Sequence, residues 1–185
     1  GEVLVVHGAG GGVGLTAVAI GKQLGATVIA TASSPAKLEA ARECGADHLI
    51  DSSDDVRLRI RELSNGHGAD VVYDPVGGDL FTASLRSMAF EGRILIIGFA
   101  SGSVPQIPAN HLLVRNVDVF GVNWPAYAEQ QPDVMISSFR TLVQWYLDGV
   151  LKPQVSATYP LTQALEGLNQ VVGRKSTGKV VITIG

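Results

Sequence analysis

The sequence is poor in cysteine, in charged residues and in long apolar runs. Cys44 is its one cysteine, which excludes a disulfide framework and any zinc site that needs several thiolates. No apolar run reaches about 18 residues, so we expect no transmembrane helix. Lys and Arg number 14 against 17 Asp and Glu, a net charge of −3. This balance offers no basic surface for nucleic acid.

Apolar residues and glycine are abundant instead. Hydrophobic residues make up 46% of the 185 and charged residues 17%, a composition that supports a packed core and excludes intrinsic disorder. Glycine accounts for 22 residues, about 12% of the chain against a usual share near 7%. No period of three accompanies it, which excludes a collagen-like chain. The positions of the glycines therefore carry the information.

Short apolar segments alternate with helical stretches from residue 3 to residue 122. Strands are expected at Val3–Val6, Thr27–Thr31, His48–Ile50, Val71–Tyr73, Arg93–Ile97 and Val117–Val122. Helices are expected between them, at Leu15–Leu24, Pro35–Gly45, Asp54–Leu63 and Asp79–Met88. Because the strands are almost wholly apolar, both faces of their sheet must be covered. The pattern predicts an α/β fold, a Rossmann doubly wound six-stranded parallel sheet with helices on both faces.

The chain divides into a large domain and a short tail. Residues 1–150 are expected to form a dinucleotide-binding domain that ends with a long helix, Pro132–Leu147. Residues 151–185 contain a helix from Leu161 to about Val172 and a last strand, Lys179–Ile184. This tail is too small for a domain, and we expect it to complete the sheet and to contribute strands to a neighbouring domain. The opening Gly1-Glu2-Val3 enters a strand at once, which predicts a piece of a longer protein.

The strongest motif is the glycine-rich segment after the first strand, HGAGGGVG at residues 7–14. Relative to the G-x-G-x-x-G fingerprint, the three key positions hold Ala9, Gly11 and Gly14. Gly11 leaves the backbone open to a pyrophosphate, and Gly14 allows the helix to lie close to the strand. The helix N-terminus would present free N–H groups to the phosphates. The alternative is a merely tight turn, but four glycines in Gly8–Gly12 exceed what a turn needs.

The end of the second strand indicates which dinucleotide is bound. Sites that prefer NAD place Asp or Glu there, whereas this chain has Ser33, Ser34 and Lys37 and no carboxylate. An acid would repel a 2′-phosphate, and hydroxyls with a lysine would bind it, so NADPH is favoured over NADH. The alternative is that Ser34 is only a helix N-cap and Lys37 a solvated charge.

The remaining candidate residues favour structural roles. The four histidines, His7, His48, His67 and His111, show no metal-ligand spacing, and we expect no metal and a packed, polar role for His7. Asp79 is expected to be a helix N-cap. Cys44 is interpreted as a small core residue.

The motifs taken together carry a family resemblance. They are HGAGGGVG at 7–14, GAD at 45–47, DVVYDPVGG at 70–78, GRILIIGF at 92–99 and GKVV at 178–181. With them the chain resembles the cofactor-binding domain of the medium-chain dehydrogenase/reductase superfamily, in its zinc-free NADPH:quinone oxidoreductase-like group, which includes enoyl and alkenal reductases.

The resemblance implies a two-domain oxidoreductase. A GroES-like substrate domain would precede this segment, and the tail would pack on it. The family transfers hydride from NADPH to quinones or to α,β-unsaturated carbonyl compounds, so the substrate is expected to be a small hydrophobic electrophile. No catalytic residue is expected within this chain, and the chain alone is expected to be inactive.

The resemblance also assigns cofactor contacts to residues at strand ends. The adenosine half, with its phosphates, would meet Gly10, Gly11, Gly12, Val13, Ser33, Lys37, Ser52 and Gly78. The nicotinamide half would meet Phe99, Ala100, Val122, Asn123 and Trp124. Ser52 departs from the Tyr or His that relatives often have near the adenosine phosphate, and this weakens the preference for NADPH. All these residues follow predicted strands, where a doubly wound sheet binds its ligand.

Two other functions remain open, a non-catalytic nucleotide-binding or structural module and the enoyl-reductase segment of a larger synthase. The segment Val117–Val122 resembles the edge strand through which relatives form a homodimer. The expected compartment is the cytoplasm, with the mitochondrial matrix as the alternative.

Overall fold

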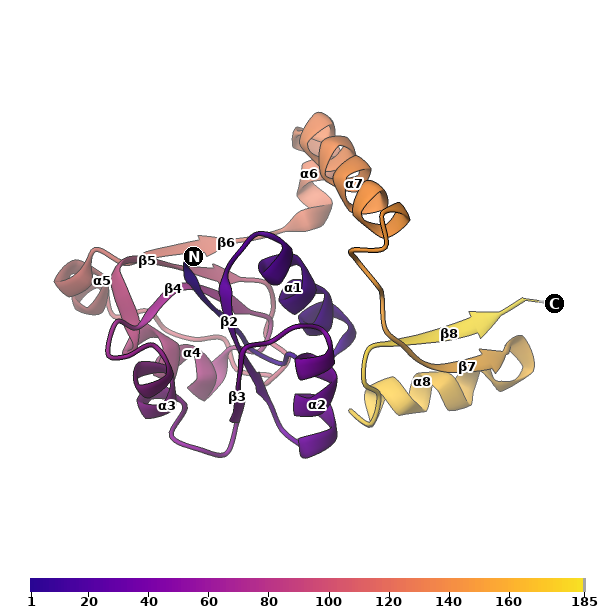
Figure 1. Ribbon diagram of the computed structural model, residues 1–185, viewed down its shortest axis with the longest axis horizontal. Helices are drawn as coiled ribbons and strands as arrows, with labels where there is room; N and C mark the ends of the chain where they lie inside the picture. Colours follow the sequence, from indigo (N-terminus) through magenta and orange to yellow (C-terminus); the bar gives the residue numbers. More distant parts are fainter. Residues whose placement is uncertain (185) are drawn as a thin grey trace.

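The computed structural model describes residues 1–184, and its centre is one six-stranded sheet in which every pairing is parallel (Figure 1). The strands are β1 (Val3–Val6), β2 (Thr27–Ala32), β3 (His48–Asp51), β4 (Ala69–Asp74), β5 (Met88–Ile96) and β6 (Asp118–Gly121). Their order is β3-β2-β1-β4-β5-β6. This is the Rossmann order, and it confirms the predicted fold class.

Each face of the sheet has its own helical cover. Val5 and Val6 are adjacent and both fully buried, yet they belong to different core clusters, because successive side chains of a strand point to opposite faces. Val6 packs with residues of α1 (Gly12–Gln23) and α2 (Pro35–Glu43). Val5 packs with residues of α3 (Val56–Leu63) and α4 (Gly78–Leu85).

The helix ends follow the local chemistry of the sequence. Ser34 is the N-cap of α2 and Pro35 its first residue, as predicted. The prediction for Asp79 was wrong: α4 has Gly77 as its N-cap, and Asp79 lies in the first turn. The reason is that the Asp74 carboxylate already accepts from the backbone N–H groups of Val76 and Gly77, at 2.8 and 2.9 Å.

The structure adds elements that the sequence pattern did not indicate. They are the short helices α5 (Ala109–Arg115) and α6 (Trp124–Gln130) and the strand β7 (Val155–Pro160). The long helix α7 (Pro132–Leu147) has the predicted bounds. Among residues 1–184, no helix combines the length and the apolar character that crossing a membrane requires.

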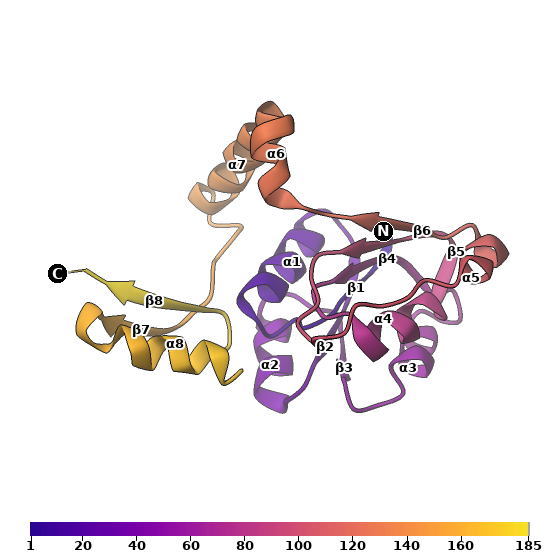
Figure 2. The ribbon, with the colours of Figure 1, turned by 180° about the vertical axis from the view of Figure 1, so that it is seen from behind.

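The tail does not complete the main sheet, which corrects the prediction for residues 151–185. β7 pairs in parallel with β8 (Lys179–Thr183) in a separate two-stranded sheet. The connection runs through a 3-10 turn, η1 (Leu161–Gln163), and α8 (Ala164–Val172), which lies along both strands (Figure 2). Gly167 allows this close packing, because a Cβ there would lie 3.1 Å from side-chain atoms of Tyr159 and Ile182. The tail thus forms a βαβ unit of its own.

Candidate functional site

The strand order reverses direction between β1 and β4, and this places a crevice at the carboxyl end of β1. β1 pairs with β2 on one side and with β4 on the other, so the connections that leave these strands diverge. The glycine-rich loop, residues 7–14, joins β1 to α1 at this point. All predicted cofactor residues belong to connections that leave the carboxyl ends of the six strands.

The glycines of this loop are required for different reasons. A Cβ on Gly14 would overlap the backbone of Gly8 and Ala9, so this glycine brings α1 against the strand, as predicted. A Cβ on Gly10 would overlap the side chain of Lys37. At Gly11 the nearest atom would be 3.5 Å away, which is ordinary contact, so the protein itself does not demand glycine there. Such a position suits the approach of a ligand.

Gly12 and Val13 begin α1. A Cβ on Gly12 would lie 3.1 Å from the carbonyl oxygen of Gly178, so this glycine makes room for the tail. The side chain of Val13 is 51% exposed although it follows a buried strand and loop. The free N–H groups of the first turn and this exposed side chain together form an open surface at the helix N-terminus.

The end of β2 carries hydroxyls and an amine. Ser33 is exposed and Ser34 half-buried, and residues 31–37 contain no carboxylate. The side chain of Lys37 passes over Gly10, and its amine donates to the backbone carbonyl of Arg174 at 2.8 Å. Because Gly10 has no Cβ, the side chain of Lys37 has room to lie against the glycine-rich loop.

The loop after β4 is held by a buried carboxylate. Asp74 is 1% exposed, and its two backbone hydrogen bonds fix residues 75–77. Gly77 and Gly78 both have positive φ, +72° and +61°, and a Cβ on Gly77 would lie 3.3 Å from the ring of Phe99. The backbone of Gly78 therefore lies beside the segment that follows β5.

His7 has the packed, polar role that the sequence predicted. Its ring is fully buried and hydrogen-bonded to the hydroxyls of Thr31 and Ser84, at 2.9 and 2.6 Å. Burial lowers the pKa of His7 to about 4, although the nearby Asp74 carboxylate opposes this shift. His7 is therefore neutral near pH 7, and it ties β1 to β2 and α4 beneath the loop.

The remaining predicted residues lie along the edge of the sheet that the carboxyl ends of its strands form. The backbone N–H of Ser52 donates to Ala32, and that of Val122 donates to Ile96, each at 2.9 Å, so both residues directly follow the sheet. Asn123 and Trp124 are exposed at the start of α6. The indole of Trp124 lies 5.5 Å from the ring of Tyr127 and 6.4 Å from that of Phe139. Its side chain is thus engaged with α6 and α7.

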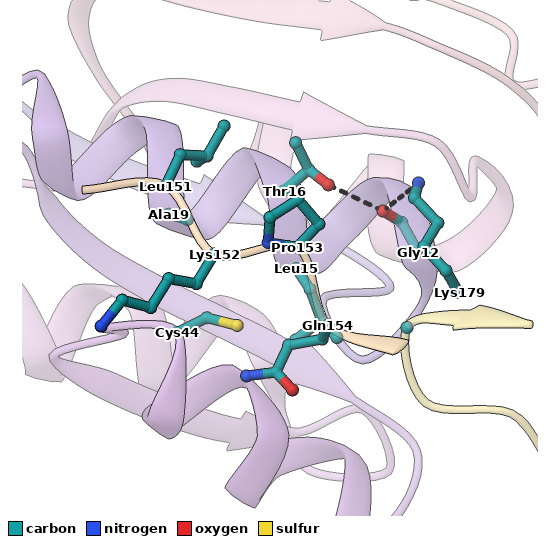
Figure 3. A pocket seen from close by; sticks show the side chains of 11 residues that line it. Gly12, Leu15, Thr16, Ala19, Cys44, Leu151, Lys152, Pro153, Gln154 and Lys179 are labelled. Carbon is teal, nitrogen blue, oxygen red and sulfur yellow. Dashed lines mark hydrogen bonds between the residues drawn. The ribbon is translucent and has the colours of Figure 1, made fainter. Parts of the chain in front are cut away.

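The tail contributes two residues that were not predicted as cofactor contacts, Arg174 and Lys179, although Lys179 belongs to the GKVV motif. Arg174 donates to the carbonyl of Ala100 at 2.8 Å, and its own carbonyl accepts from Lys37. The amine of Lys179 donates to the carbonyl of Gly12 at 2.9 Å (Figure 3). The N–H of Gly178 donates to Gly10 at 3.2 Å. In the structure Gly178 has a positive φ, and a Cβ there would lie 2.6 Å from the carbonyl oxygen of Gln154.

A small cavity lies between α1 and the chain segment that leads into β7. Figure 3 shows Leu15, Ala19, Cys44 and Pro153 around it. Its volume is about 20 Å³, enough for about one water molecule and far too little for a dinucleotide. Burial raises the pKa of the Cys44 thiol, in keeping with a packing role. In residues 1–184 no group of three or more metal-ligating side chains comes together.

A protein-family model matches this chain. Residues 12–146 match the family described as zinc-binding dehydrogenase. The match begins at the glycine-rich loop and ends within α7.

Curated relatives align with nearly the whole chain. A quinone oxidoreductase-like protein 2 homolog from Nematostella vectensis is 38% identical over 98% of the chain and 50% of its own length. A 2-haloacrylate reductase from a Burkholderia species is 33% identical over 98% of the chain and 55% of its length. A phthioceranic/hydroxyphthioceranic acid synthase from Mycobacterium bovis is 31% identical over the whole chain but over only 9% of its own length. The chain spans about half the length of the quinone oxidoreductase-like relatives.

Solved structures show the same arrangement. A mycobacterial protein complexed with NADPH has a TM-score of 0.88 at 31% identity, over 98% of this chain and 56% of its own. The Escherichia coli quinone oxidoreductase complexed with NADPH has a TM-score of 0.87 at 28% identity, over 98% and 57%.

Proposed function

Because the chain belongs to the medium-chain dehydrogenase/reductase superfamily, in its quinone oxidoreductase-like group, we propose that it is the NADPH-binding domain of an enzyme that reduces a quinone or an α,β-unsaturated carbonyl compound. The observation that carries the proposal is the end of β2. There Lys37 lies beside Gly10 of the glycine loop, Ser33 is exposed directly after β2, and no carboxylate opposes a 2′-phosphate. Two structural relatives are described as complexed with NADPH.

The residues of the edge fit the adenosine half of the cofactor. Gly11 and the exposed first turn of α1 would receive the pyrophosphate, with Gly10, Gly12 and Val13 around them. The amine of Lys37 donates a hydrogen bond to the backbone carbonyl of Arg174. A phosphate dianion is a much stronger acceptor for this amine than a carbonyl. Ser33 and Lys37 would bind the 2′-phosphate, while Ser52 and Gly78 would lie on the adenosine side.

The other half of the edge would position the nicotinamide. Phe99 and Ala100 would contact its ribose, and Val122, Asn123 and Trp124 would meet its amide through their backbone groups. When bound, NADPH supplies the hydride. The part of this chain is to orient the cofactor and to exclude water, and no catalytic side chain within it is invoked.

The substrate would be bound with a second domain. The chain spans about half of its relatives, and a GroES-like domain is proposed to precede it and to pack on residues 151–185. A small hydrophobic electrophile would bind between the two domains. We further propose a zinc-independent enzyme in a reducing compartment, the cytoplasm or the mitochondrial matrix, and a homodimer formed through the exposed edge of β6.

A second function is favoured by one specific observation. The whole chain aligns with a segment that makes up only 9% of the mycobacterial synthase. A domain of this kind therefore exists within a much larger protein. The enoyl-reductase segment of a synthase is therefore the alternative. A synthase segment would use the same cofactor site as a separate reductase, and the sequence that flanks the chain distinguishes these two functions. A non-catalytic nucleotide-binding module is the third option, and it predicts no reductase activity when the flanking domain is present.

The proposal is tested by reversing the charge at the end of β2. Lys37→Glu is expected to weaken NADPH binding by at least about tenfold while changing NADH binding much less, because only NADPH carries the 2′-phosphate. Fluorescence titration of the reduced nicotinamide measures both affinities. Arg140→Glu, the same charge reversal on the exposed face of α7, is the control and should affect neither. Equal losses for both cofactors in Lys37→Glu would defeat the 2′-phosphate assignment.

A further inference from the structure

A second pocket lies between α3, α4 and α5, outside the edge described above. Its volume is about 370 Å³, which is in the range of small-molecule sites, and none of the predicted cofactor residues lines it. In both views α3 and α5 lie on the side of the molecule away from α8 and the tail sheet (Figures 1 and 2). Nothing in the proposed reaction uses this pocket.

The pocket is lined by three arginines that come from separate elements. Arg57 stands in the first turn of α3, Arg86 is the C-cap of α4, and Arg115 is the last residue of α5. No carboxylate lines the pocket, although the whole chain has a net charge of −3. Three arginines thus line one pocket without a carboxylate among the lining residues, an arrangement that a bound anion stabilises.

These arginines are available to a ligand. Arg59, on the same helix as Arg57, forms an ion pair with Glu62, whereas Arg57 and Arg86 form none with any residue from 1 to 184. One amino group of Arg115 donates to the carbonyl of Met88 at 2.7 Å, which fixes the direction of its guanidinium. The site therefore combines one positioned guanidinium with two unpaired ones.

The rest of the lining limits the kind of anion. Asn110 and His111 add polar groups on α5, while Leu85 and Val114 add apolar surface. The volume exceeds what a bare phosphate ion fills, so the ligand needs an organic body as well as an anionic group. A carboxylate is satisfied by a single forked arginine, whereas a phosphate dianion offers three oxygens to three guanidinium groups.

We propose that this pocket binds a small organic phosphate monoester, separately from the dinucleotide. The phosphate group lies among Arg57, Arg86 and Arg115, and the organic part lies against Leu85 and Val114. The site is thus a second ligand site on the outer helical layer of the domain.

Calorimetric titration with phenyl phosphate and with inorganic phosphate tests this proposal on the chain as it stands. Phenyl phosphate is expected to bind saturably, with one site per chain, and more tightly than inorganic phosphate because of the apolar wall. Arg57→Gln and Arg86→Gln should each weaken it by about tenfold, since each removes charged hydrogen bonds. Both side chains are exposed, and the unfolding midpoint of each variant verifies that the fold is retained.

Two control variants separate this site from general anion binding and from the dinucleotide edge. Arg140→Gln removes an exposed arginine elsewhere and should leave the affinity unchanged, as should Lys37→Glu. The absence of saturable binding, or an equal loss in Arg140→Gln, would overturn the proposal. A loss in Lys37→Glu would place the anion at the end of β2 and would overturn it as well.

Discussion

Residues 1–123 and residues 124–184 bury their apolar side chains to very different extents. The six-stranded body has a core on each face of its sheet, with residues such as Val5, Val6 and Phe81 almost completely buried. In the second region only Leu151 and Gly167 are buried. Phe139 on α7 and Leu165 on α8 are 53% and 70% exposed. The body therefore completes its own core, and the second region presents apolar surface that a further partner would cover.

This difference agrees with a chain that spans about half of its relatives. The polar contacts between the two regions include the backbone bridge of Gly11 with Gly178 and the hydrogen bonds of Lys37, Arg174 and Lys179. Apolar contact is made by the segment that leads into β7, where Leu151 and Pro153 line a small cavity with Leu15 and Ala19 of α1. We therefore expect substitutions in the body to change global stability and substitutions in the second region to change it little. Both tryptophans lie in the second region, Trp124 on α6 and Trp145 on α7, so their fluorescence reports on these two helices separately from the body.

The largest expected effect compares two phenylalanines. Phe81→Ala should lower the free energy of unfolding by about 3–5 kcal/mol, because Phe81 is 1% exposed within the core between the sheet and α4. Phe139→Ala is the matched control and should cost under about 1 kcal/mol, since its ring is half exposed. Urea unfolding followed by circular dichroism measures both values. Similar losses in the two variants would contradict the contrast between the regions.

The next effect is a pH dependence that belongs to the body. Unfolded His7 takes up a proton near pH 6.5, whereas folded His7 does so only near pH 4. The stability that neutral, buried His7 provides is therefore complete above pH 6.5 and is lost as the pH falls toward 4, by about 3 kcal/mol.

His7→Gln removes this titration and serves as the comparison. Its stability should fall less between pH 7 and pH 4 than that of the unmodified chain, whatever its stability at pH 7. Unfolding curves recorded across this interval provide the test. Identical pH slopes for the two chains would mean that His7 is not held neutral by burial.

A smaller effect distinguishes two glycines of the same loop. Gly14→Ala forces a Cβ against the backbone of Gly8 and Ala9 and should destabilise the body by about 1–3 kcal/mol. Gly12→Ala meets only the tail, at Gly178 and Lys179, and should leave the body intact while loosening the tail. Circular dichroism measures the first effect, and proteolysis of the exposed segment 173–175 measures the second. Faster proteolysis in Gly14→Ala alone would reverse these assignments.

The smallest expected effect concerns the contact of Lys179 with the loop. Lys179→Met keeps most of the side chain but removes the hydrogen bond to the carbonyl of Gly12. Because the ammonium is exposed, the loss should be under about 1 kcal/mol and should appear as faster proteolysis of the tail rather than in the main unfolding transition. A shift of the main transition by several degrees would show that the tail supports the body.

The body was largely predictable from the sequence, because its signals are local. A buried apolar strand, a glycine turn and a helix start follow one another within residues 3–14, and a second buried strand leads into the helix start at Ser34-Pro35. The location of the candidate site was also predictable, because the carboxyl ends of parallel strands all lie at one edge of the sheet. Gly14 has the close contact with the backbone of Gly8 and Ala9 that its position in the motif predicted, whereas the role of Gly11 at a pyrophosphate stays a prediction.

The tail was less predictable because its structure depends on distant pairing. A parallel apolar strand looks the same whether it extends one sheet or starts another, so the separate sheet of β7 and β8 was not foreseen. Arg174 meets Lys37 and Ala100 across 137 and 74 residues of chain, and no spacing rule connects them. The short helix α5 has no buried residue and therefore gives no periodic signal.

The most direct test of the central claim is the affinity of the unmodified chain for NADPH and for NADH, measured by fluorescence titration under the same conditions. Binding of NADPH at least about tenfold tighter than NADH is the predicted result, because Ser33 and Lys37 are proposed to bind a 2′-phosphate that only NADPH carries. Equal affinities, or no binding of either dinucleotide, would contradict the account.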